Sequence, residues 1–326
     1  MKKLISVVIP CHDEEENVGP ICAAVTEELH RLSAYDHEVI FIDNRSGDRT
    51  REMIRKACAE NPKVKAIFNV KNFGQFNSPY HAMLQARGDC VICMCADFQD
   101  PPELIPRLVQ GWEEGYQIVC GVKKTSREKR WAYHLRSVYY KLIKRMSSCE
   151  QIEHFTGFGL YDRSFVEVLR SLDDPIPFLR GIVAELGGSR KEIPYEQPLR
   201  RAGRTHNNWY TLYDAAMLSF TSYTKIGLRL AVFTGGIFSL IGFLVAFVYL
   251  VMKLIYWDRF VAGQAPTLIG VFLLGSIQLF FIGLMGEYIM SINTRMMKRP
   301  LVVEGERINF EKTDIRNPGM KGADHS

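Results

Sequence analysis

Acidic and amide side chains follow an apolar run in the stretch "ICMCADFQDPPE", residues 92–103. Asp97 lies where the run ends, and Gln99 comes two residues later. Side chains two residues apart in an extended segment point the same way, so the carboxylate and the amide could share one hard cation. An acid at such a strand end can instead pair with a basic residue or cap a turn. The stretch by itself leaves these three roles open.

Asp100, in the same stretch, has a different expected role. It precedes Pro101 and Glu103 in the pattern of an N-cap, a first-turn proline and a third-position acid. We therefore expect Asp100 to cap a helix. The cysteines of this stretch do not predict zinc, because a strand turns their thiols to different faces and no fourth ligand is near.

The elements that must position these residues alternate along the first 122 residues. Short apolar runs predict strands at residues 4–10, 37–43, 64–70, 90–97 and 116–122, and amphipathic stretches predict helices at residues 18–32, 48–59, 76–86 and 101–114. Strict alternation indicates an α/β layer with a mostly parallel sheet, whose ligands bind at the carboxyl ends of the strands. The acids and amides at these strand ends should therefore gather at one rim.

Composition and motifs narrow the function classes. The net charge of +5 is modest and does not favour a nucleic-acid partner. Neither a G-x-G-x-x-G turn nor a Walker-type loop follows a strand, which disfavours a dehydrogenase or a P-loop kinase. The cysteines lie mostly in apolar runs, which is typical of reduced cytosolic thiols, and we expect no signal peptide.

Two long apolar segments predict a membrane hairpin. Residues 230–252 and 260–286 contain no charged side chain, and each is long enough to span a hydrocarbon core of about 30 Å as a helix. Basic residues gather before and after the pair, so both ends should face the cytoplasm. The alternative is two buried helices of a soluble core. The aromatic segment that precedes the hairpin is typical of an interfacial amphipathic helix.

Several motifs, taken together, resemble a known group. "VVIPCHDEEENV", "IDNRSGDRT", "KNFGQ", "ADFQDPPEL", "FLRGIVAELGG" and the helical pair ending in "GEYI" and "KRPL" occur in order along nearly the whole chain. They resemble the polyprenyl-phosphate glycosyltransferases of glycosyltransferase family 2, which include dolichyl-phosphate mannose synthases and bactoprenol glucosyltransferases. The resemblance implies a Rossmann-like GT-A domain, two transmembrane helices and a divalent cation, Mg²⁺ or Mn²⁺.

The resemblance also implies an activity and a location. The donor would be a nucleotide diphosphate sugar, with a UDP-hexose expected, and the acceptor would be polyprenyl (undecaprenyl) phosphate. The transfer would invert the anomeric centre at the cytoplasmic face of the inner membrane, without a nucleic-acid partner. The resemblance also implies that the chain can form a homo-oligomer.

Carried over position by position, the resemblance assigns site residues. The nucleoside would be held by Pro10, Asp13, Glu14, Asp43, Lys71, Asn72 and Gly74. Asp97 and Gln99 would be the second and third members of the Asp-Ala-Asp-x-Gln metal motif, and Cys95 takes the place of the first. A thiol is a poor magnesium ligand, so this departure weakens the expected metal site.

A second departure bears on the acceptor. Relatives read Gly-Asp-Phe-Arg-Leu, with the aspartate often proposed as the base, where this chain has Gly157 and Gly159. A sugar hydroxyl would need a base there, whereas a phosphate monoester is already mostly dianionic at pH 7. Glu185 is an alternative base, or an ordinary helix residue that pairs with an arginine.

The acceptor phosphate needs cationic side chains, and two basic segments, residues 121–145 and 200–209, supply them. Within these segments we expect the phosphate to contact Arg127, Arg136 and Arg204. His206 takes the place of a basic residue found in the relatives.

The expected organisation has four parts: a cytoplasmic GT-A domain at residues 1–205, an interfacial segment at 206–228, a transmembrane hairpin at 229–293 and a cytoplasmic tail at 294–326. Two other functions fit the replacements at Cys95 and Gly157. One is a catalytically silent relative that binds a nucleotide sugar or a lipid. The other is a transferase that uses a hydroxyl of a lipid-linked saccharide.

Overall fold

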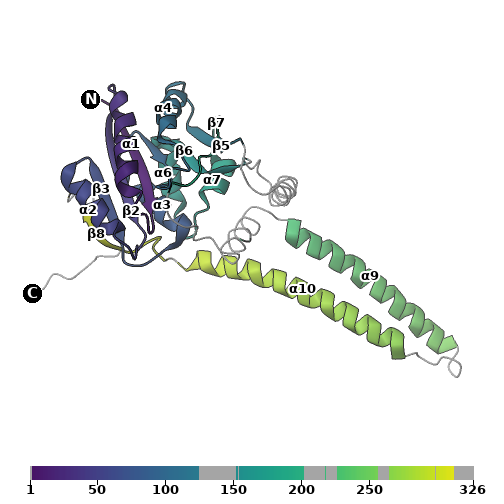
Figure 1. The fold of residues 1–326 in the computed structure, drawn as a ribbon. Coiled ribbons are helices and arrows are strands. Elements are labelled where there is room, and N and C mark those ends of the chain that lie inside the picture. Colours follow the sequence, from purple (N-terminus) through teal and green to yellow (C-terminus); the bar gives the residue numbers. More distant parts are fainter. Residues whose placement is uncertain are drawn as a thin grey trace, which may run out of the picture. The chain divides into compact units, whose positions relative to one another are not determined.

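A computed structural model describes residues 2–124, 152, 154–201, 217, 226–255, 264–297 and 299–311 (Figure 1). The chain forms two compact units. The first comprises Met1–Ser137, Gln151–His206 and Met297–Ser326, and the second comprises Val138–Glu150 and Asn207–Met296. We describe each unit by itself.

The first unit is built on an eight-stranded sheet in the order β7-β5-β6-β4-β1-β2-β3-β8. Its strands are β1 (Leu4–Cys11), β2 (Asp36–Asp43), β3 (Val64–Asn69), β4 (Cys90–Cys93), β5 (Ile118–Lys123), β6 (Phe155–Asp162), β7 (Arg190–Tyr195) and β8 (Glu304–Ile308). The pairs β1–β2, β1–β4, β2–β3 and β5–β7 are parallel, whereas β6 and β8 run antiparallel to their neighbours. The expected mostly parallel sheet is thus confirmed, as are the first five strands.

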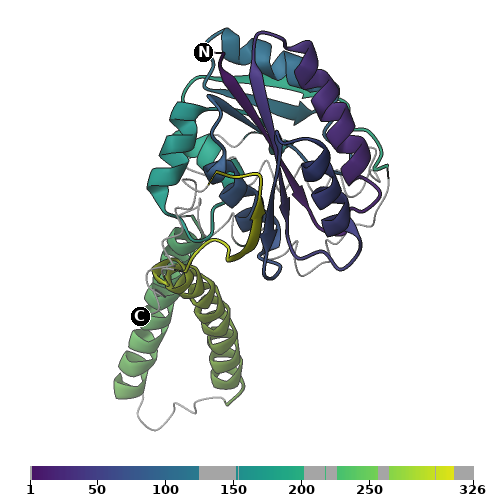
Figure 2. The same cartoon turned by 90° about the vertical axis from the view of Figure 1, so that its left-hand side faces the viewer.

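Helices cover both faces of this sheet (Figure 2). They are α1 (Val18–Arg31), α2 (Thr50–Glu60), α3 (Gly74–Gln85), η1 (Pro102–Leu104), α4 (Ile105–Glu113), α6 (Arg163–Leu172) and α7 (Leu179–Leu186). Successive strand residues point to opposite faces, so Val7 joins one apolar core with α1, α2 and α4, while Val8 joins a second core with α3, α6 and α7. The strands β1, β2 and β4 are buried on both faces, which explains their continuous apolar runs.

The C-terminal segment differs from its expected form. Residues 304–308, assigned to a tail by the sequence, form β8 on the outer edge of β3. The segment is charged and short, so no apolar alternation revealed it. Its consequence is that the chain returns to the sheet after the helical pair.

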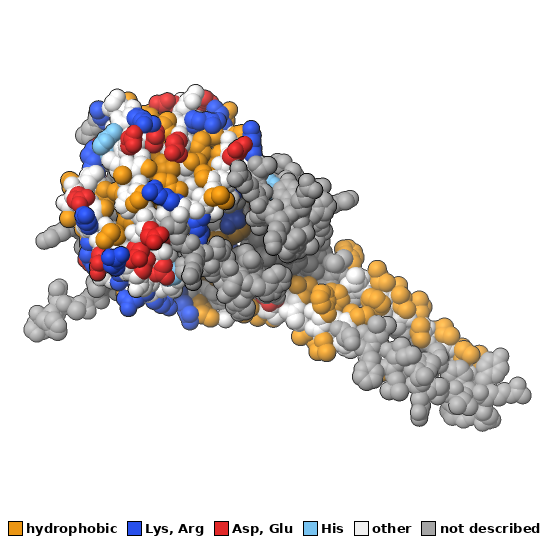
Figure 3. All heavy atoms as spheres, in the orientation of Figure 1, with side chains coloured by type: hydrophobic (Ala, Val, Ile, Leu, Met, Phe, Trp, Pro, Cys, Tyr) orange, Lys and Arg blue, Asp and Glu red, His pale blue; other side chains and the backbone are white. Residues whose placement is uncertain are grey.

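The second unit contains two long helices, α9 (Ile226–Ile255) and α10 (Gln264–Met296). Among the described residues, no helix meets the combined length and apolarity needed to cross a membrane, so the predicted two-helix span is not supported. Both helices nevertheless expose large apolar side chains, for example Phe233 at 70% and Leu279 at 71% (Figure 3). Of the expected interfacial segment 206–228, only Met217 and residues 226–228 are described.

Candidate active site

The turn after β4 places Asp97 beside an arginine from a distant part of the chain. The Asp97 carboxylate is buried, and its Oδ2 accepts hydrogen bonds from Nε and Nη2 of Arg200 at 2.9 and 2.8 Å. Its Oδ1 accepts from the Gln99 backbone N–H at 3.1 Å, which closes the turn. Of the three roles that the sequence left open, the described arrangement therefore shows pairing and turn capping.

The same turn is tied to the segment after β7 by two further contacts. The Arg201 backbone N–H donates to the Asp97 carbonyl at 3.4 Å. The Arg201 guanidinium lies 5.3 Å from the centre of the Phe98 ring. Phe98 has a left-handed backbone with φ 61°, a conformation that a bulky residue adopts only where its surroundings hold it.

Asp100 does not cap the helix that follows, so that prediction is wrong. The N-cap position of η1 is Pro101, and no side chain caps this helix. Asp100 is buried and accepts from the Cys95 backbone N–H at 3.0 Å and from the Tyr195 hydroxyl at 2.9 Å. Burial raises the pKa of the Asp100 carboxyl, although these hydrogen bonds oppose the shift. Asp100 thus joins the turn to the end of β7.

Lys123 supplies a second cation near Asp97 and Asp100. It ends β5, and burial lowers the pKa of its amine, while the charges of Asp100 and Asp97 act in the opposite direction. Arg180 on α7 adds a further positive charge that lowers the same pKa. The buried acids after β4 therefore face a set of half-buried cations.

The end of β1 carries the predicted nucleoside residues. Pro10 is paired in register with Ile42 of β2 near the end of the strand. Asp13 has φ 55°, and its Oδ1 accepts from the Gly47 backbone N–H at 2.7 Å. Glu14 accepts from Asn17 Nδ2 at 2.6 Å.

The acid Glu14 links the β1 and β4 loops electrostatically. Burial is the main cause that raises the pKa of the Glu14 carboxyl, and the charge of Asp97 adds to it. Arg200 lowers the same pKa. Because β1 and β4 are parallel neighbours, Glu14 after β1 and Asp97 after β4 lie at one rim of the sheet.

Asp43, expected to read the base of the nucleotide, is fully buried and paired. Its Oδ2 accepts from Arg51 Nε at 2.6 Å, and both oxygens accept from backbone N–H groups of the turn that follows. Arg51 also donates to the Asn69 carbonyl at 2.7 Å. The Asp43 carboxylate thus shapes the turn between β2 and α2.

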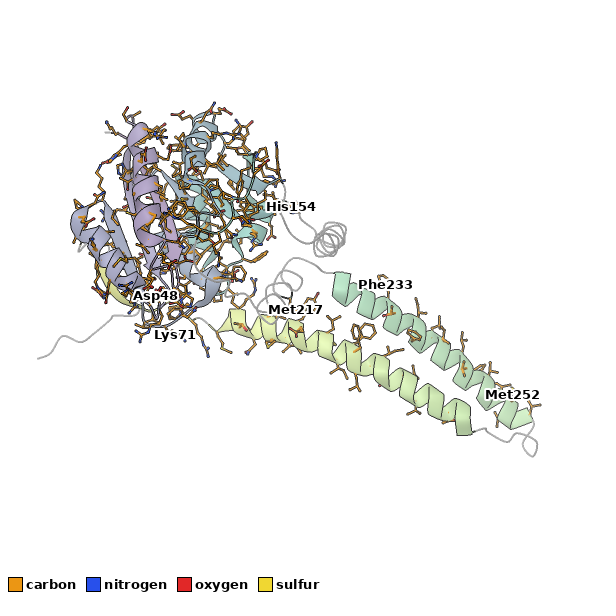
Figure 4. The ribbon with its side chains drawn as sticks, in the orientation of Figure 1. Asp48, Lys71, His154, Met217, Phe233 and Met252 are labelled. Carbon is orange, nitrogen blue, oxygen red and sulfur yellow. The ribbon has the colours of Figure 1, made fainter. Side chains whose placement is uncertain are left out.

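Amide side chains connect the ends of β2 and β3. Asn44 Nδ2 donates to Asn72 Oδ1 at 2.8 Å and to the Gly74 carbonyl at 3.1 Å. Lys71 is exposed, with its amine 5.0 Å from the centre of the Phe73 ring. In Figure 4 Lys71 and Asp48 lie at the same end of the α/β unit. These residues form a loop held by its own amides, and the exposed Lys71 lies over the Phe73 ring beside it.

The glycines that replace the family's Asp and Arg have clear structural reasons. Gly157 has φ 101°, a backbone that disfavours any side chain. A Cβ on Gly159 would lie 2.5 Å from the Val119 carbonyl oxygen, so β5 leaves no room for an arginine there. Glu185, the alternative base, is exposed on α7.

As arranged, these residues do not fit a divalent cation. Both Asp97 oxygens are engaged, and the guanidinium of Arg200 occupies the position of a counter-ion. Within the described part of the chain, no three His, Cys, Asp or Glu side chains are grouped closely enough to hold a metal.

The sequence missed Arg200 and predicted three other arginines. Arg127, Arg136 and Arg204, together with His206, lie outside the described residues. The signal for Arg200 was its place at the start of the basic segment "RRAGRTH", but nothing local linked it to Asp97.

Comparisons with known proteins show the family of the chain. The family model "Glycosyl transferase family 2" matches residues 6–170. An uncharacterized glycosyltransferase of Synechocystis sp. is 30% identical over 308 residues, covering 94% of this chain and 96% of its own. A bactoprenol glucosyl transferase of Shigella phage SfX is 30% identical, covering 91% of this chain and 97% of its own.

Among solved structures, glucosyl-3-phosphoglycerate synthase from Mycobacterium tuberculosis in complex with phosphoglyceric acid aligns with a TM-score of 0.49 at 16% identity. It covers 67% of this chain and 78% of its own. The family match and the observed mostly parallel sheet confirm the expected GT-A fold. The chain therefore belongs to glycosyltransferase family 2 and is a glycosyltransferase.

Proposed function

We propose that the enzyme transfers one hexose from a nucleotide diphosphate sugar, probed first with UDP-glucose, to a polyprenyl phosphate. The relatives named bactoprenol glucosyl transferase support this, because their similarity covers 91% of this chain. The family model matches residues 6–170, whereas the similarity to these relatives spans 297 residues and therefore includes much of α9 and α10.

The observation that carries the proposal is Gly157. The backbone there has φ 101°, so the position favours glycine over the aspartate that would deprotonate a sugar hydroxyl. A phosphate monoester has a second pKa of about 6 and needs no base at pH 7. An acceptor phosphate is thus the nucleophile that suits a site without this carboxylate.

In the proposed step a phosphate oxygen of the acceptor attacks the anomeric carbon of the donor. The new carbon–oxygen bond forms as the bond to the donor diphosphate breaks, and the nucleoside diphosphate leaves with both electrons of that bond. No proton has to be transferred. Negative charge grows on the leaving diphosphate, and Arg200 and Lys123 are the described cations whose place at the β4 rim suits its stabilisation.

Residues on β1 and the β3–α3 loop are proposed to hold the donor. Asp13, Glu14, Lys71 and Asn72 would contact the nucleoside, with Pro10 and Gly74 shaping the pocket. Asp43 acts in this proposal as a positioning residue, because its carboxylate is fully buried against Arg51. Arg127, Arg136 and Arg204 stay proposed contacts of the acceptor phosphate.

We also propose that α9 and α10 insert their exposed apolar side chains into a bilayer. Soluble proteins rarely expose contiguous apolar patches, and these helices expose Val232, Phe233, Leu279 and Phe280, each to about 70%. Carbonate extraction of membranes should leave the protein in the pellet. Recovery in the supernatant would contradict insertion.

Transfer is tested with purified full-length protein, radiolabelled UDP-glucose and undecaprenyl phosphate in detergent micelles. We expect a labelled lipid product that Asp97→Asn lowers about 100-fold, because the Asp97 carboxylate holds Arg200, which stabilises the leaving diphosphate. Asp36→Asn is the matched control, because Asp36 is an exposed acid that pairs with Lys63. Absence of product with every common sugar nucleotide would contradict the proposal.

Two observations favour a catalytically silent binding protein instead. Asp97 is engaged by Arg200, and Cys95 replaces the first metal-motif acid. Such a protein would bind UDP without turnover, and Cys95→Asp would not change this. A transferase for a lipid-linked saccharide would give product only when the acceptor offers a sugar hydroxyl.

A further inference from the structure

The chain that follows α10 runs along one face of α3. Asn77, His81 and Gln85 are spaced by four residues, so they share this face. Asn77 Nδ2 donates to the Leu301 carbonyl at 3.3 Å, His81 Nε2 lies 2.5 Å from Glu304 Oε1, and Gln85 Oε1 accepts from Arg307 at 2.9 Å. All three contacts are made with residues 301–307.

Glu304 is the centre of this contact. Its side chain is only 5% exposed and accepts from both His81 and Arg307. Burial opposes ionisation, yet the hydrogen bonds from His81 and Arg307 lower the pKa of the Glu304 carboxyl to about 2. Glu304 is therefore a buried anion that joins α3 to the segment after α10.

The same segment also holds the chain in front of α3. The Val70 backbone N–H donates to the Val303 carbonyl at 3.1 Å. Lys71 and Asn72 follow directly, and α3 begins at Gly74. The loop 70–74 is thus fixed at both ends by residues 301–307, through its own backbone and through the helix that it starts.

We propose that residues 301–307 form a latch that positions the loop 70–74 for nucleotide-sugar binding, with His81 and Glu304 as positioning residues. The inference depends on the proposed function in one respect, that this loop flanks the donor. It assigns no contact between the latch and the donor. The latch acts by restricting the loop. Its loss should therefore raise the KM for the donor and leave the KM for the acceptor unchanged.

Glu304→Ala in the full-length protein tests the latch, with Glu306→Ala as the matched control. Glu306 lies on the same strand but pairs with Arg55 at the surface. In Glu304→Ala we expect hydrogen exchange of residues 70–76 to rise about tenfold, as for local opening. The donor KM should rise about fivefold while kcat and the acceptor KM change less than twofold. Adding His81→Ala to Glu304→Ala should cause little further change, because both remove one interaction.

An even rise in exchange across the sheet, or equal changes in both KM values, would show a purely structural role and overturn the proposal. Unchanged exchange at 70–76 would overturn it as well. If Glu304→Ala does not fold, Glu304→Gln, which keeps the shape but not the charge, carries the same comparison. The exchange measurement requires no turnover, so absence of transfer in the unmodified enzyme would count against the proposed function and leave the latch to be judged by exchange.

Discussion

Asp43 and Asp97 end up in closely similar surroundings by different routes. Asp43 is the last residue of β2, and Asp97 lies in the turn after β4. Each is buried and accepts from an arginine whose side chain is about one quarter exposed. Each is followed within two residues by a left-handed residue, Arg45 at φ 64° or Phe98 at φ 61°. The two carboxylates thus look equivalent when considered singly.

Their arginines differ in how they are held. Arg51 comes from α2, eight residues along the chain, and donates to both Asp43 and the Asn69 carbonyl. Arg200 comes from 103 residues away, and its Nε and Nη2 both donate to a single Asp97 oxygen. We expect the first pair to be a fixed part of the domain, and the second to open when a ligand draws Arg200 away from Asp97. Four measurements test this contrast.

The largest effect is expected for Arg51→Ala. Removing the guanidinium leaves a fully buried carboxylate unpaired, so the free energy of unfolding should fall by about 3–5 kcal/mol. Urea denaturation measures this. Lys56→Ala on the same helix, which removes an exposed pair with Glu60, should cost less than about 1 kcal/mol. Equal costs would show that Asp43 does not depend on its arginine.

Arg200→Ala should affect the reaction more than the fold. We expect the rate of sugar transfer to fall about 100- to 1000-fold, as for loss of a group that stabilises developing charge. The free energy of unfolding should fall by less than in Arg51→Ala. Transfer assays and denaturation on the same preparation make the comparison. A stable, fully active variant would remove Arg200 from the site.

A smaller effect is expected on the affinity for Mn²⁺. If Arg200 competes with a cation for Asp97, Arg200→Ala should bind Mn²⁺ about tenfold more tightly without nucleotide, because a like charge is removed. Electron paramagnetic resonance titration measures free Mn²⁺. Lys56→Ala should match the unmodified protein. Unchanged or weaker binding in Arg200→Ala would show that the arginine does not compete.

The smallest effect concerns the two left-handed residues. Arg45→Gly should raise the free energy of unfolding by about 0.5–1 kcal/mol, because glycine adopts this backbone without steric cost. Phe98→Gly should not stabilise, since Phe98 packs on the core and against Arg201. Thermal unfolding of both variants compares them. Stabilisation by Phe98→Gly would mean that its ring contributes little.

The sequence predicted the first half of the fold well, for a physical reason. β1 to β5 are buried on both faces or bounded by amphipathic helices, so their apolar runs are continuous and easily read. β6 contains Gly157 and Gly159, which give no periodic signal, and β8 has the sequence "EGERI". These two strands form because they pair with strands that are distant in the sequence, β6 with β4 and β5, and β8 with β3.

The site was predictable in part. Strand ends indicated that Asp13, Glu14 and Asp97 would meet at one rim, and Glu14 and Asp97 do influence each other. The partner of Asp97 was not predictable, because a separation of 103 residues leaves no local pattern. Asp100 followed the pattern of a helix cap, yet tertiary contacts with Cys95 and Tyr195 prevailed over this local preference.

An open sheet has two outer strands whose unpaired backbone groups can recruit another chain. Here one border is β8, which exposes the charged Glu306, and the other is β7, which has Pro194 and neighbouring charges. Charged side chains and proline at such borders discourage intermolecular strand addition. Loss of β8 would expose the far more apolar β3, so a chain shortened before residue 304 should be prone to aggregate through that strand.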